Sequence, residues 1–240
     1  MSAVLYARAG AVATITLNRP ESRNALNLEM CEGIEKAARA AAADPDVRLV
    51  FVRAAGVAFC AGADLKERQG MDADRTRERR LRAFAAYAAL EALPMPSVAV
   101  VAGPAVGSGC EIAAACDFIV ATTEAWFATP EAVRGTVGAT QRLPRALGLR
   151  LAKDMMFTGR RLGAAEALRL GFVTRLVQPS ALERELAAIA KAVCDAPPAA
   201  LRLAKRCLNA GEAAARAAAL ATELEAIEEL LASGGGLGKR

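Results

Sequence analysis

Two apolar patterns alternate along the chain and predict its secondary structure. Short runs rich in β-branched residues are typical of strands, and longer segments with apolar residues three or four positions apart are typical of helices. The predicted strands are residues 11–17, 47–52, 97–102, 117–121 and 173–177. The predicted helices are residues 26–43, 77–93, 110–116, 141–147, 150–157, 164–170, 181–194, 199–210 and 212–231. Strand–helix–strand order implies an α/β architecture with right-handed crossovers.

The pattern changes near residue 178 and divides the chain into two parts. Strands and helices alternate before this point, whereas only helical patterns follow it. We therefore predict an α/β core over residues 1–178 and a helical C-terminal region over residues 179–240. The charged residues 66–75 carry no apolar stripe and predict a mobile stretch. The glycine-rich residues 233–236 predict a frayed end.

The composition limits the chemistry that the chain can perform, because it contains no histidine. Proton transfer near neutral pH must then fall to carboxylates, lysines, cysteines or tyrosines. The six cysteines form no C-x-x-C pair, and without histidine we expect no metal site. Most of them stand in apolar segments, which predicts inert buried thiols in a reducing compartment.

The distribution of apolar and charged residues suggests where the protein resides and what it binds. No apolar run is long enough to cross a bilayer, and no signal peptide is visible, so we expect a soluble cytoplasmic protein without a membrane partner. The apolar fraction of 54% is typical of a chain that also buries subunit faces. Basic residues cluster in residues 66–82 and 134–161. Such clusters fit a phosphate-bearing ligand, although solvated helix faces are the alternative.

Two glutamates are candidate acid–base residues. Glu111 follows the turn G-S-G-C at residues 107–110, where a helix is predicted to begin, and Glu131 follows a proline. Unpaired N–H groups at a helix start favour negative charge on a bound carbonyl oxygen. Ile112 stands where a dinucleotide fingerprint needs glycine, so a nicotinamide or flavin site is not expected. Tight packing of the turn and helix stabilisation by the acids are the structural alternatives.

The loop A-G-A-D-L-K at residues 61–66 is a second source of backbone N–H groups. Its small residues allow a ligand to approach the backbone closely. Lys66 at its end could meet a phosphate as a point charge. An ordinary turn with a surface lysine is the alternative.

Six segments of the chain carry a family resemblance. They are L-N-R-P-E-S-R-N-A-L (17–26), A-F-C-A-G-A-D-L-K-E (58–67), V-A-G-P-A-V-G-S-G-C-E-I-A-A-A-C-D (101–117), F-A-T-P-E (127–131), T-Q-R-L-P-R (140–145) and F-T-G-R-R-L-G-A-A-E-A-L-R-L-G-F-V (157–173). Together they resemble the crotonase, or enoyl-CoA hydratase/isomerase, superfamily. The segments occur in the family's order and at its familiar spacing, over roughly residues 11–210.

This resemblance implies a crotonase-like spiral of repeated β-β-α turns, followed by a helical C-terminal trimerisation region. Homotrimers that pair into hexamers are expected. The ligand implied is an acyl-CoA thioester, so coenzyme A enters as part of the substrate and no tightly bound cofactor is expected. The two backbone N–H groups that form the family's oxyanion hole map onto Ala63 and Ser108. The family's CoA-binding positions map onto Arg23, Ala25, Ala61, Asp64, Leu65 and Lys66.

The activity implied is the reversible hydration of a 2-enoyl-CoA to a 3-hydroxyacyl-CoA. Attack at C3 gives the thioester enolate character, which two N–H groups would stabilise. The family's two catalytic glutamates map onto Glu111 and Glu131, which would hold the water and share the acid and base roles. The sequence leaves open which residue is the acid. It also leaves open the acyl chain and the pathway, whether fatty acid, amino acid or aromatic degradation.

Two departures from the family pattern keep alternative functions open. Residues 135–143, G-T-V-G-A-T-Q-R-L, are three residues shorter than the glycine loop that the family commonly places beside the acyl pocket. An enoyl-CoA isomerase, or another lyase that passes through the same enolate, is therefore an alternative. The basic-aromatic C-terminal helix that can contact CoA across a subunit boundary is also missing.

Two alternatives come from other classes of protein. A pI of about 9.1 and the basic stretch 134–161 suggest a non-catalytic RNA-binding relative. No aromatic residues interleave for base stacking, so we expect no nucleic-acid partner. A serine or cysteine hydrolase is disfavoured, because no histidine is available to activate its nucleophile.

Overall fold

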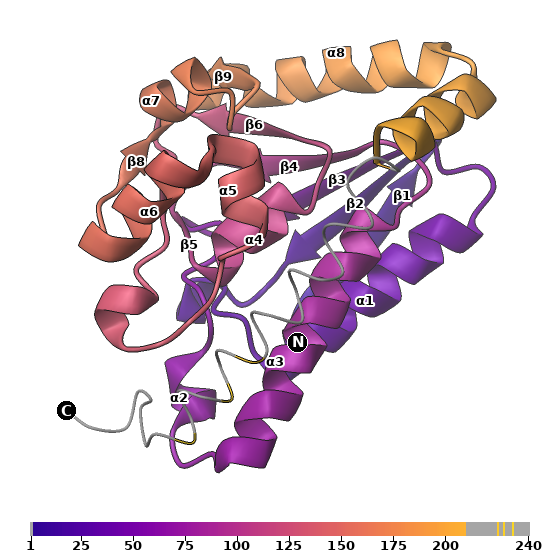
Figure 1. The fold of residues 1–240 in the computed structure, drawn as a ribbon. Coiled ribbons are helices and arrows are strands. Elements are labelled where there is room, and N and C mark those ends of the chain that lie inside the picture. The colour runs from indigo at the N-terminus through magenta and orange to yellow at the C-terminus, as the bar shows by residue number, and fades with distance from the viewer. Residues whose placement is uncertain (1, 210–224, 226–227, 229–231, 233–240) are drawn as a thin grey trace.

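A computed structural model describes residues 2–209 together with residues 225, 228 and 232 (Figure 1). The predicted helix at residues 212–231 and the glycine-rich stretch 233–236 lie largely outside these residues. Within them the α/β architecture is confirmed: strands and helices alternate through most of the chain. None of the helices in this part of the chain combines the length and apolar character needed to cross a membrane.

The main sheet has six strands, in the spatial order β1-β2-β3-β4-β6-β9. Their bounds are β1 Val4–Ala9, β2 Val12–Leu17, β3 Leu49–Ala54, β4 Ser97–Val101, β6 Phe118–Thr122 and β9 Arg175–Val177. β1 and β2 are antiparallel, and the other neighbours are parallel. All five predicted strands are present. β1 escapes the sequence pattern because its residues after Val4 are exposed, so no apolar run marks it.

A small second sheet positions the functional site. Its strands are β5 Ala105–Val106, β7 Trp126–Ala128 and β8 Leu162–Gly163, in the order β5-β7-β8. They are too short to produce a recognisable period, which is why the sequence did not predict them. β5 and β7 are parallel, with Val106 opposite Ala128. The segments that follow these two strands therefore emerge at the same edge of the sheet.

Helices cover both faces of the main sheet (Figure 1). Their bounds are α1 Leu28–Ala43, α2 Leu65–Arg68, α3 Ala73–Glu91, α4 Ser108–Ala114, α5 Arg142–Leu147, α6 Leu149–Thr158, α7 Ala164–Arg169 and α8 Leu182–Asp195, with residues 198–209 also helical. Short 3₁₀ turns lie at η1 Pro20–Ser22, η2 Ala132–Arg134 and η3 Pro179–Ala181.

The sequence pattern predicts no helix over residues 66–75, but α2 and the start of α3 occupy most of this segment. Aspartate caps explain the difference. The carboxylate of Asp64 accepts hydrogen bonds from the N–H groups of Lys66 and Glu67, and Asp72 accepts one from Arg75. These caps satisfy donors that a helix start leaves unpaired, so short polar helices form without an apolar stripe.

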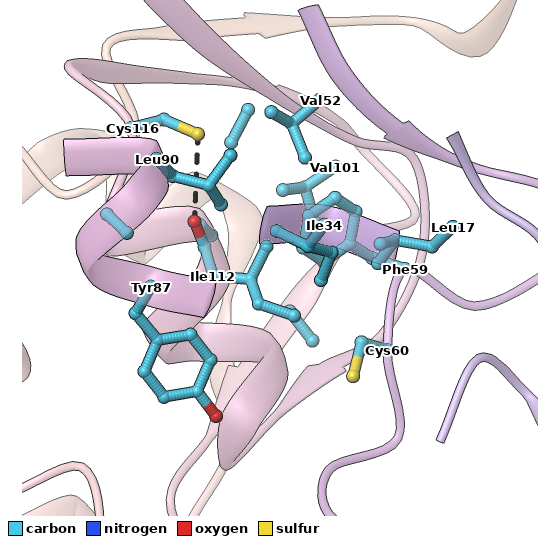
Figure 2. Packing of buried hydrophobic residues seen from close by; sticks show 14 of the residues in the cluster. Leu17, Ile34, Val52, Phe59, Cys60, Tyr87, Leu90, Val101, Ile112 and Cys116 are labelled. Carbon is cyan, nitrogen blue, oxygen red and sulfur yellow. Dashed lines mark hydrogen bonds between the residues drawn. The ribbon is translucent and has the colours of Figure 1, made fainter. Parts of the chain in front are cut away.

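The core lies on both faces of the sheet, because alternate residues of each central strand point in opposite directions. In β3, Val50 and Val52 pack toward α1, α3 and α4, whereas Leu49 and Phe51 pack toward α8. Figure 2 shows the first of these clusters, which includes Ile112 of α4. Burial on both faces explains the continuous apolar runs of β3 and β4.

Candidate active site

A pocket opens where the segments after β5 and β7 meet. It contains about 520 Å³ of empty space, part of it open to solvent. Five of the predicted site residues line it, namely Ala61, Ala63, Leu65, Ser108 and Glu131. The pocket therefore combines both predicted backbone donors with one of the two predicted acids.

The carboxylate of Glu131 lies against the bare backbone of the glycine turn. Gly107 has φ +52° and ψ −110°, a conformation that non-glycine residues rarely adopt. A Cβ built on Gly107 would lie closer than 3.0 Å to Oε1 of Glu131, which real Cβ atoms essentially never do. The parallel register of β5 and β7 produces this approach, and the N–H of Gly107 donates to the carbonyl of Ala128 at 2.8 Å. Glycine is thus required both for the backbone angles and for room for the carboxylate.

The predicted donor Ala63 is oriented by a short parallel bridge to Leu26. The N–H of Leu26 donates to the carbonyl of Gly62 at 2.8 Å, and the N–H of Asp64 donates to the carbonyl of Leu26 at 2.9 Å. Neighbouring N–H groups of an extended segment point in opposite directions. The N–H of Ala63 therefore points away from Leu26.

The second predicted donor, Ser108, is the first residue of α4, where a helix provides no internal acceptor for the N–H. Among the residues that the structure describes, neither Ala63 nor Ser108 donates a backbone hydrogen bond. The loop that carries Ala63 is joined to the segment before Ser108, because the N–H of Val106 donates to the carbonyl of Cys60 at 2.9 Å. A Cβ on Gly109 would collide with that same carbonyl, so glycine allows this close packing.

Glu111 lies beside the pocket and is held by a buried ion pair. It is 2% exposed and is not one of the residues that line the pocket. Its Oε1 lies 3.3 Å from Nη1 of Arg142, a residue that is itself only 4% exposed. Arg142 also binds both carboxylate oxygens of Glu91, at 2.8 and 3.0 Å. Glu111 stands three positions after Ser108 on α4, so the two residues are neighbours on one helix face.

The pKa of Arg142 results from opposing effects. Burial alone would lower it, but the hydrogen bonds from Arg142 to Glu91 and the charge of Glu111 raise it above the usual arginine value. Arg142 therefore remains a cation in the interior. A fixed cation favours the ionised form of the carboxyl group beside it.

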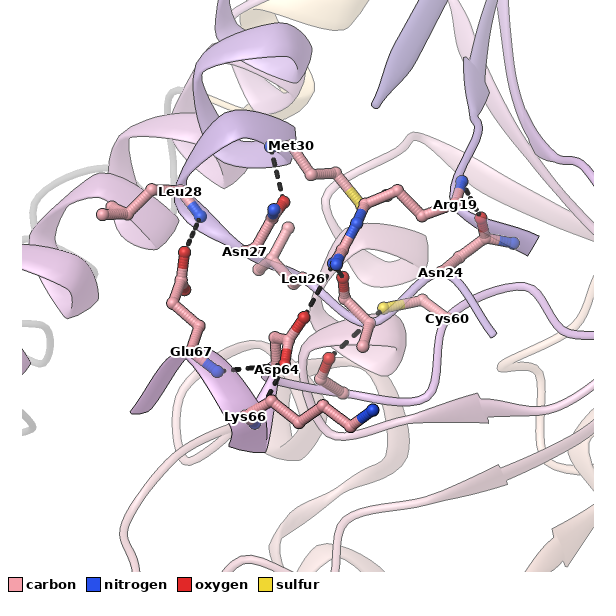
Figure 3. Close-up of polar contacts among 12 residues, drawn as sticks. Arg19, Asn24, Leu26, Asn27, Leu28, Met30, Cys60, Asp64, Lys66 and Glu67 are labelled. Atoms are coloured by element: carbon pink, nitrogen blue, oxygen red, sulfur yellow. Dashed lines mark hydrogen bonds and ion pairs between the residues drawn. The ribbon is translucent and has the colours of Figure 1, made fainter. Parts of the chain in front are cut away.

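Some of the predicted CoA-binding residues line the pocket, and others hold the surrounding segments in place. Asp64 is mainly structural, since it caps α2 and forms an ion pair of 2.9 Å with Arg19 (Figure 3). Burial raises the pKa of Asp64, but the hydrogen bond from Arg19 and those from the backbone of α2 outweigh it and lower the pKa. Arg23 and Ala25 do not line the pocket, and the carbonyl of Arg23 accepts a hydrogen bond from Ala61 at 3.0 Å. Lys66 is exposed at the start of α2.

Other groups that could carry chemistry are held neutral by burial. Burial raises the pKa of Cys60 to about 12, and it raises the pKa of Cys110 well above the usual value, with a further contribution from Glu131. The pKa of Tyr87 is raised well above the usual value by burial and then by Glu111. The buried thiols are free, as predicted, and Cys207 is exposed. Within the described residues, no group of three metal-ligating side chains is present.

Sequence reasoning missed three arginines that line the pocket, Arg68, Arg80 and Arg134. They come from the end of α2, from α3 and from η2. Their stretches are visible in the sequence only as basic clusters, and nothing in the spacing indicates which members converge.

The chain is similar to several known proteins. Residues 7–234 match the family model described as enoyl-CoA hydratase/isomerase. A short-chain-enoyl-CoA hydratase of Clostridium acetobutylicum is 36% identical over 230 residues, which cover 94% of this chain and 88% of that protein. A crotonyl-CoA hydratase of Syntrophomonas wolfei is 37% identical over 204 residues, covering 83% of this chain and 78% of the relative. The crystal structure of an enoyl-CoA hydratase/isomerase from Xanthobacter autotrophicus Py2 superposes with a TM-score of 0.90 at 37% identity, covering 95% of this chain and 87% of the other.

Proposed function

Because the chain belongs to the enoyl-CoA hydratase/isomerase family, we propose that it hydrates a 2-enoyl-CoA reversibly to a 3-hydroxyacyl-CoA. The observation that supports this most directly is the placement of Glu131 against Gly107, in a pocket that Ala63 and Ser108 also line. An acid–base group and two backbone donors then face one bound thioester. The absence of histidine leaves carboxylates as the fitting groups for the proton transfers.

In this proposal the thioester oxygen accepts hydrogen bonds from the N–H groups of Ala63 and Ser108. Addition of water forms a bond between its oxygen and C3, and the electrons of the C2–C3 double bond move toward the thioester oxygen. The two donors stabilise the negative charge that develops there, and loss of one such donor costs roughly 3–4 kcal/mol in enzymes of other kinds. Protonation at C2 then completes the 3-hydroxyacyl-CoA.

The two glutamates share the proton transfers, as the family resemblance implies. Glu111 is paired with Arg142, so its ionised form is favoured and it is suited to accept a proton from water. Glu131 lines the pocket and is suited to deliver a proton to C2. The two groups act as a coupled pair, so apparent pKa values from a rate profile belong to the pair.

The test is the loss of the conjugated thioester chromophore of crotonyl-CoA upon addition of purified protein. We expect Glu111→Gln and Glu131→Gln each to lower kcat by about 10²- to 10⁴-fold, as for loss of a general acid or base. Glu124→Gln is the matched control, because Glu124 is exposed and lies outside the pocket. Unchanged turnover in both active-site variants would rule out this mechanism.

A second candidate, an enoyl-CoA isomerase, is favoured by one observation. The shortened segment 135–143 packs directly on the catalytic glutamate, since a Cβ on Gly138 would lie 3.2 Å from Cγ of Glu131. Less room remains there for a water molecule, and an isomerase needs none. Incubation with a 3-enoyl-CoA in ¹⁸O-labelled water distinguishes the two, because isomerisation produces conjugation without incorporation of the label.

The substrate and assembly follow from the same proposal. Coenzyme A would pass beside Leu65 and Lys66 at the mouth of the pocket, so Lys66→Met should raise KM for every acyl-CoA.

Exposed apolar side chains on and after α6, among them Leu149 and Phe157, support a subunit interface in a trimer or hexamer. Light scattering should then give three or six times the 24.9 kDa of one chain. The free buried thiols fit a reducing, cytoplasmic location.

A further inference from the structure

One side chain of α3, Arg80, reaches from that helix to the loop formed by residues 135–141. Its Nη2 donates a hydrogen bond to the carbonyl of Val137 at 2.8 Å. Its guanidinium carbon also lies 6.0 Å from the centre of the Phe84 ring, about one helical turn further along α3. The guanidinium is therefore held between its own helix and the loop, in the pocket that Glu131 also lines.

The same loop packs on Glu131. A Cβ built on Gly138 would lie 3.2 Å from Cγ of Glu131 and 3.0 Å from Nη1 of Arg80. The guanidinium and the glutamate side chain are therefore neighbours, and both lie against the backbone of Gly138. Oε1 of Glu131 lies against Gly107, so two backbone segments and one guanidinium enclose this side chain.

The conformation of the loop depends on contacts from outside it. Ala139 has a φ of +57°, in the left-handed region that costs an L-residue roughly 1–2 kcal/mol. Residues in such conformations persist only where their surroundings fix them. The hydrogen bond from Arg80 to Val137 is one such contact, because it joins the loop to the long helix α3.

The charged and titratable groups around Glu131 come from four elements, namely Arg68 of α2, Arg80 of α3, Cys110 and Glu111 of α4, and Arg134 of η2. Burial and the charge of Glu131 raise the pKa of Cys110, which therefore stays neutral. Arg134 is exposed, so water and salt screen its charge. Arg80 is half-buried and held in place, so its charge acts on Glu131 with less screening than that of Arg134.

Resting on the proposed hydration, we infer that Arg80 is a positioning residue for the reaction: it holds residues 135–141 against Glu131, and its charge stabilises the carboxylate that Glu131 becomes when its proton moves to C2. In that step the electron pair of the enolate forms the C2–H bond. Glu111 holds the proton taken from water, so the total charge of the two glutamates is unchanged. Arg80 takes no part in the bond changes and acts through Glu131.

The experiment compares the wild-type protein with Arg80→Met in hydration of crotonyl-CoA. Loss of a nearby cation raises the pKa of a carboxyl group, so the limb of the pH–rate profile that disappears in Glu131→Gln should move to higher pH by about one unit. We expect kcat to fall by about 10- to 100-fold, as for loss of a charged hydrogen bond.

Three further variants of α3 separate the charge of Arg80 from its other contacts. Arg80→Lys keeps the charge and a donor for Val137, so it should restore most of kcat and the position of the limb. Arg80→Gln keeps a donor without the charge and should show the same pH shift as Arg80→Met, and it replaces that variant if the methionine protein does not fold. Arg75→Met removes a charge from an exposed position and should change neither quantity.

The remaining outcomes overturn the inference while the proposed hydration stands. If kcat falls in Arg80→Met and Arg80→Gln but the limb keeps its pH, the arginine has only a structural role. If KM for crotonyl-CoA rises and kcat keeps its wild-type value, the arginine binds the acyl-CoA instead.

Failure of the proposed function is a separate result. If the wild-type protein does not hydrate crotonyl-CoA, carbon-13 NMR titration of the Glu131 carboxyl group, assigned with Glu131→Gln, decides the inference without substrate. A higher pKa in Arg80→Met than in wild type supports the role of Arg80, and equal pKa values overturn it.

Discussion

Replacement of Gly107 by alanine tests whether the glycine turn positions the Glu131 carboxylate that we propose to be catalytic. The new methyl group would occupy the place of Oε1 of Glu131, and this oxygen belongs to the flexible end of a side chain. The carboxylate can therefore rotate away at little cost to stability. The backbone angles of Gly107 add roughly 1–3 kcal/mol of strain for any other residue. We thus expect a folded protein with a modest loss of stability.

The expected loss of activity is much larger than the loss of stability. If rotation removes Glu131 from the substrate, kcat for crotonyl-CoA should fall by about 10²- to 10⁴-fold, as for loss of a general acid. Gly10→Ala is the matched control, because Gly10 also has a positive φ, of 59°, but no atom lies within 4 Å of a Cβ built there. It should lower stability without lowering kcat. Urea denaturation gives the first quantity, and loss of the conjugated thioester absorbance gives the second.

A double variant sharpens the test. If Gly107→Ala acts only through Glu131, it should have little additional effect in a Glu131→Gln background, since the two changes remove the same interaction. If the losses of kcat in the two single variants multiply in the double variant, alanine must also disturb another group, such as the backbone N–H of Ser108. A folded Gly107→Ala protein with wild-type kcat would refute the positioning argument.

Three further predictions concern stability and reactivity. Arg142→Met should lower the free energy of unfolding by about 3–5 kcal/mol, because it removes the buried cation that pairs with Glu91 and Glu111; a loss below 1 kcal/mol in urea denaturation would contradict this. Asp64→Asn should be less stable than wild type at pH 7, and the gap should narrow as the pH falls below about 4. This sign follows because the lowered pKa of Asp64 stabilises the fold above the unfolded-state pKa and that contribution is lost on protonation; a gap independent of pH would argue against it. Iodoacetamide at neutral pH should label Cys207 well before Cys60, whose pKa is about 12, and mass spectrometry of the peptides would expose the reverse order.

Long, strongly patterned elements could be predicted from the sequence. The strands β3 and β4 carry uninterrupted apolar runs, because both faces of the sheet are covered. The helix α1 is marked by its apolar stripe and by Asn27, which caps it. Segments that depend on tertiary contacts could not be predicted. The strands β5, β7 and β8 have two or three residues each and exist through pairing with one another.

The candidate site was only partly predictable for a related reason. Glu131 was identifiable through the family motif, and the structure adds its contact with the glycine turn. The ion pair of Glu111 with Arg142 joins residues 31 positions apart, and no local pattern signals it. The convergence of Arg68, Arg80 and Arg134 similarly depends on how α2, α3 and η2 are placed in space.

The buried amide of Asn24 has a consequence for how substrate preference can change. Its Nδ2 donates to the carbonyls of Ala55 and Ala58 at 2.8 Å, and its Oδ1 accepts from the N–H of Arg19 at 2.7 Å. The segment that carries Ala63 is thereby fixed to two other loops, so a displacement of one loop would displace the others. Substrate preference is therefore expected to change through other parts of the pocket lining, while the segment that carries Ala63 keeps its position.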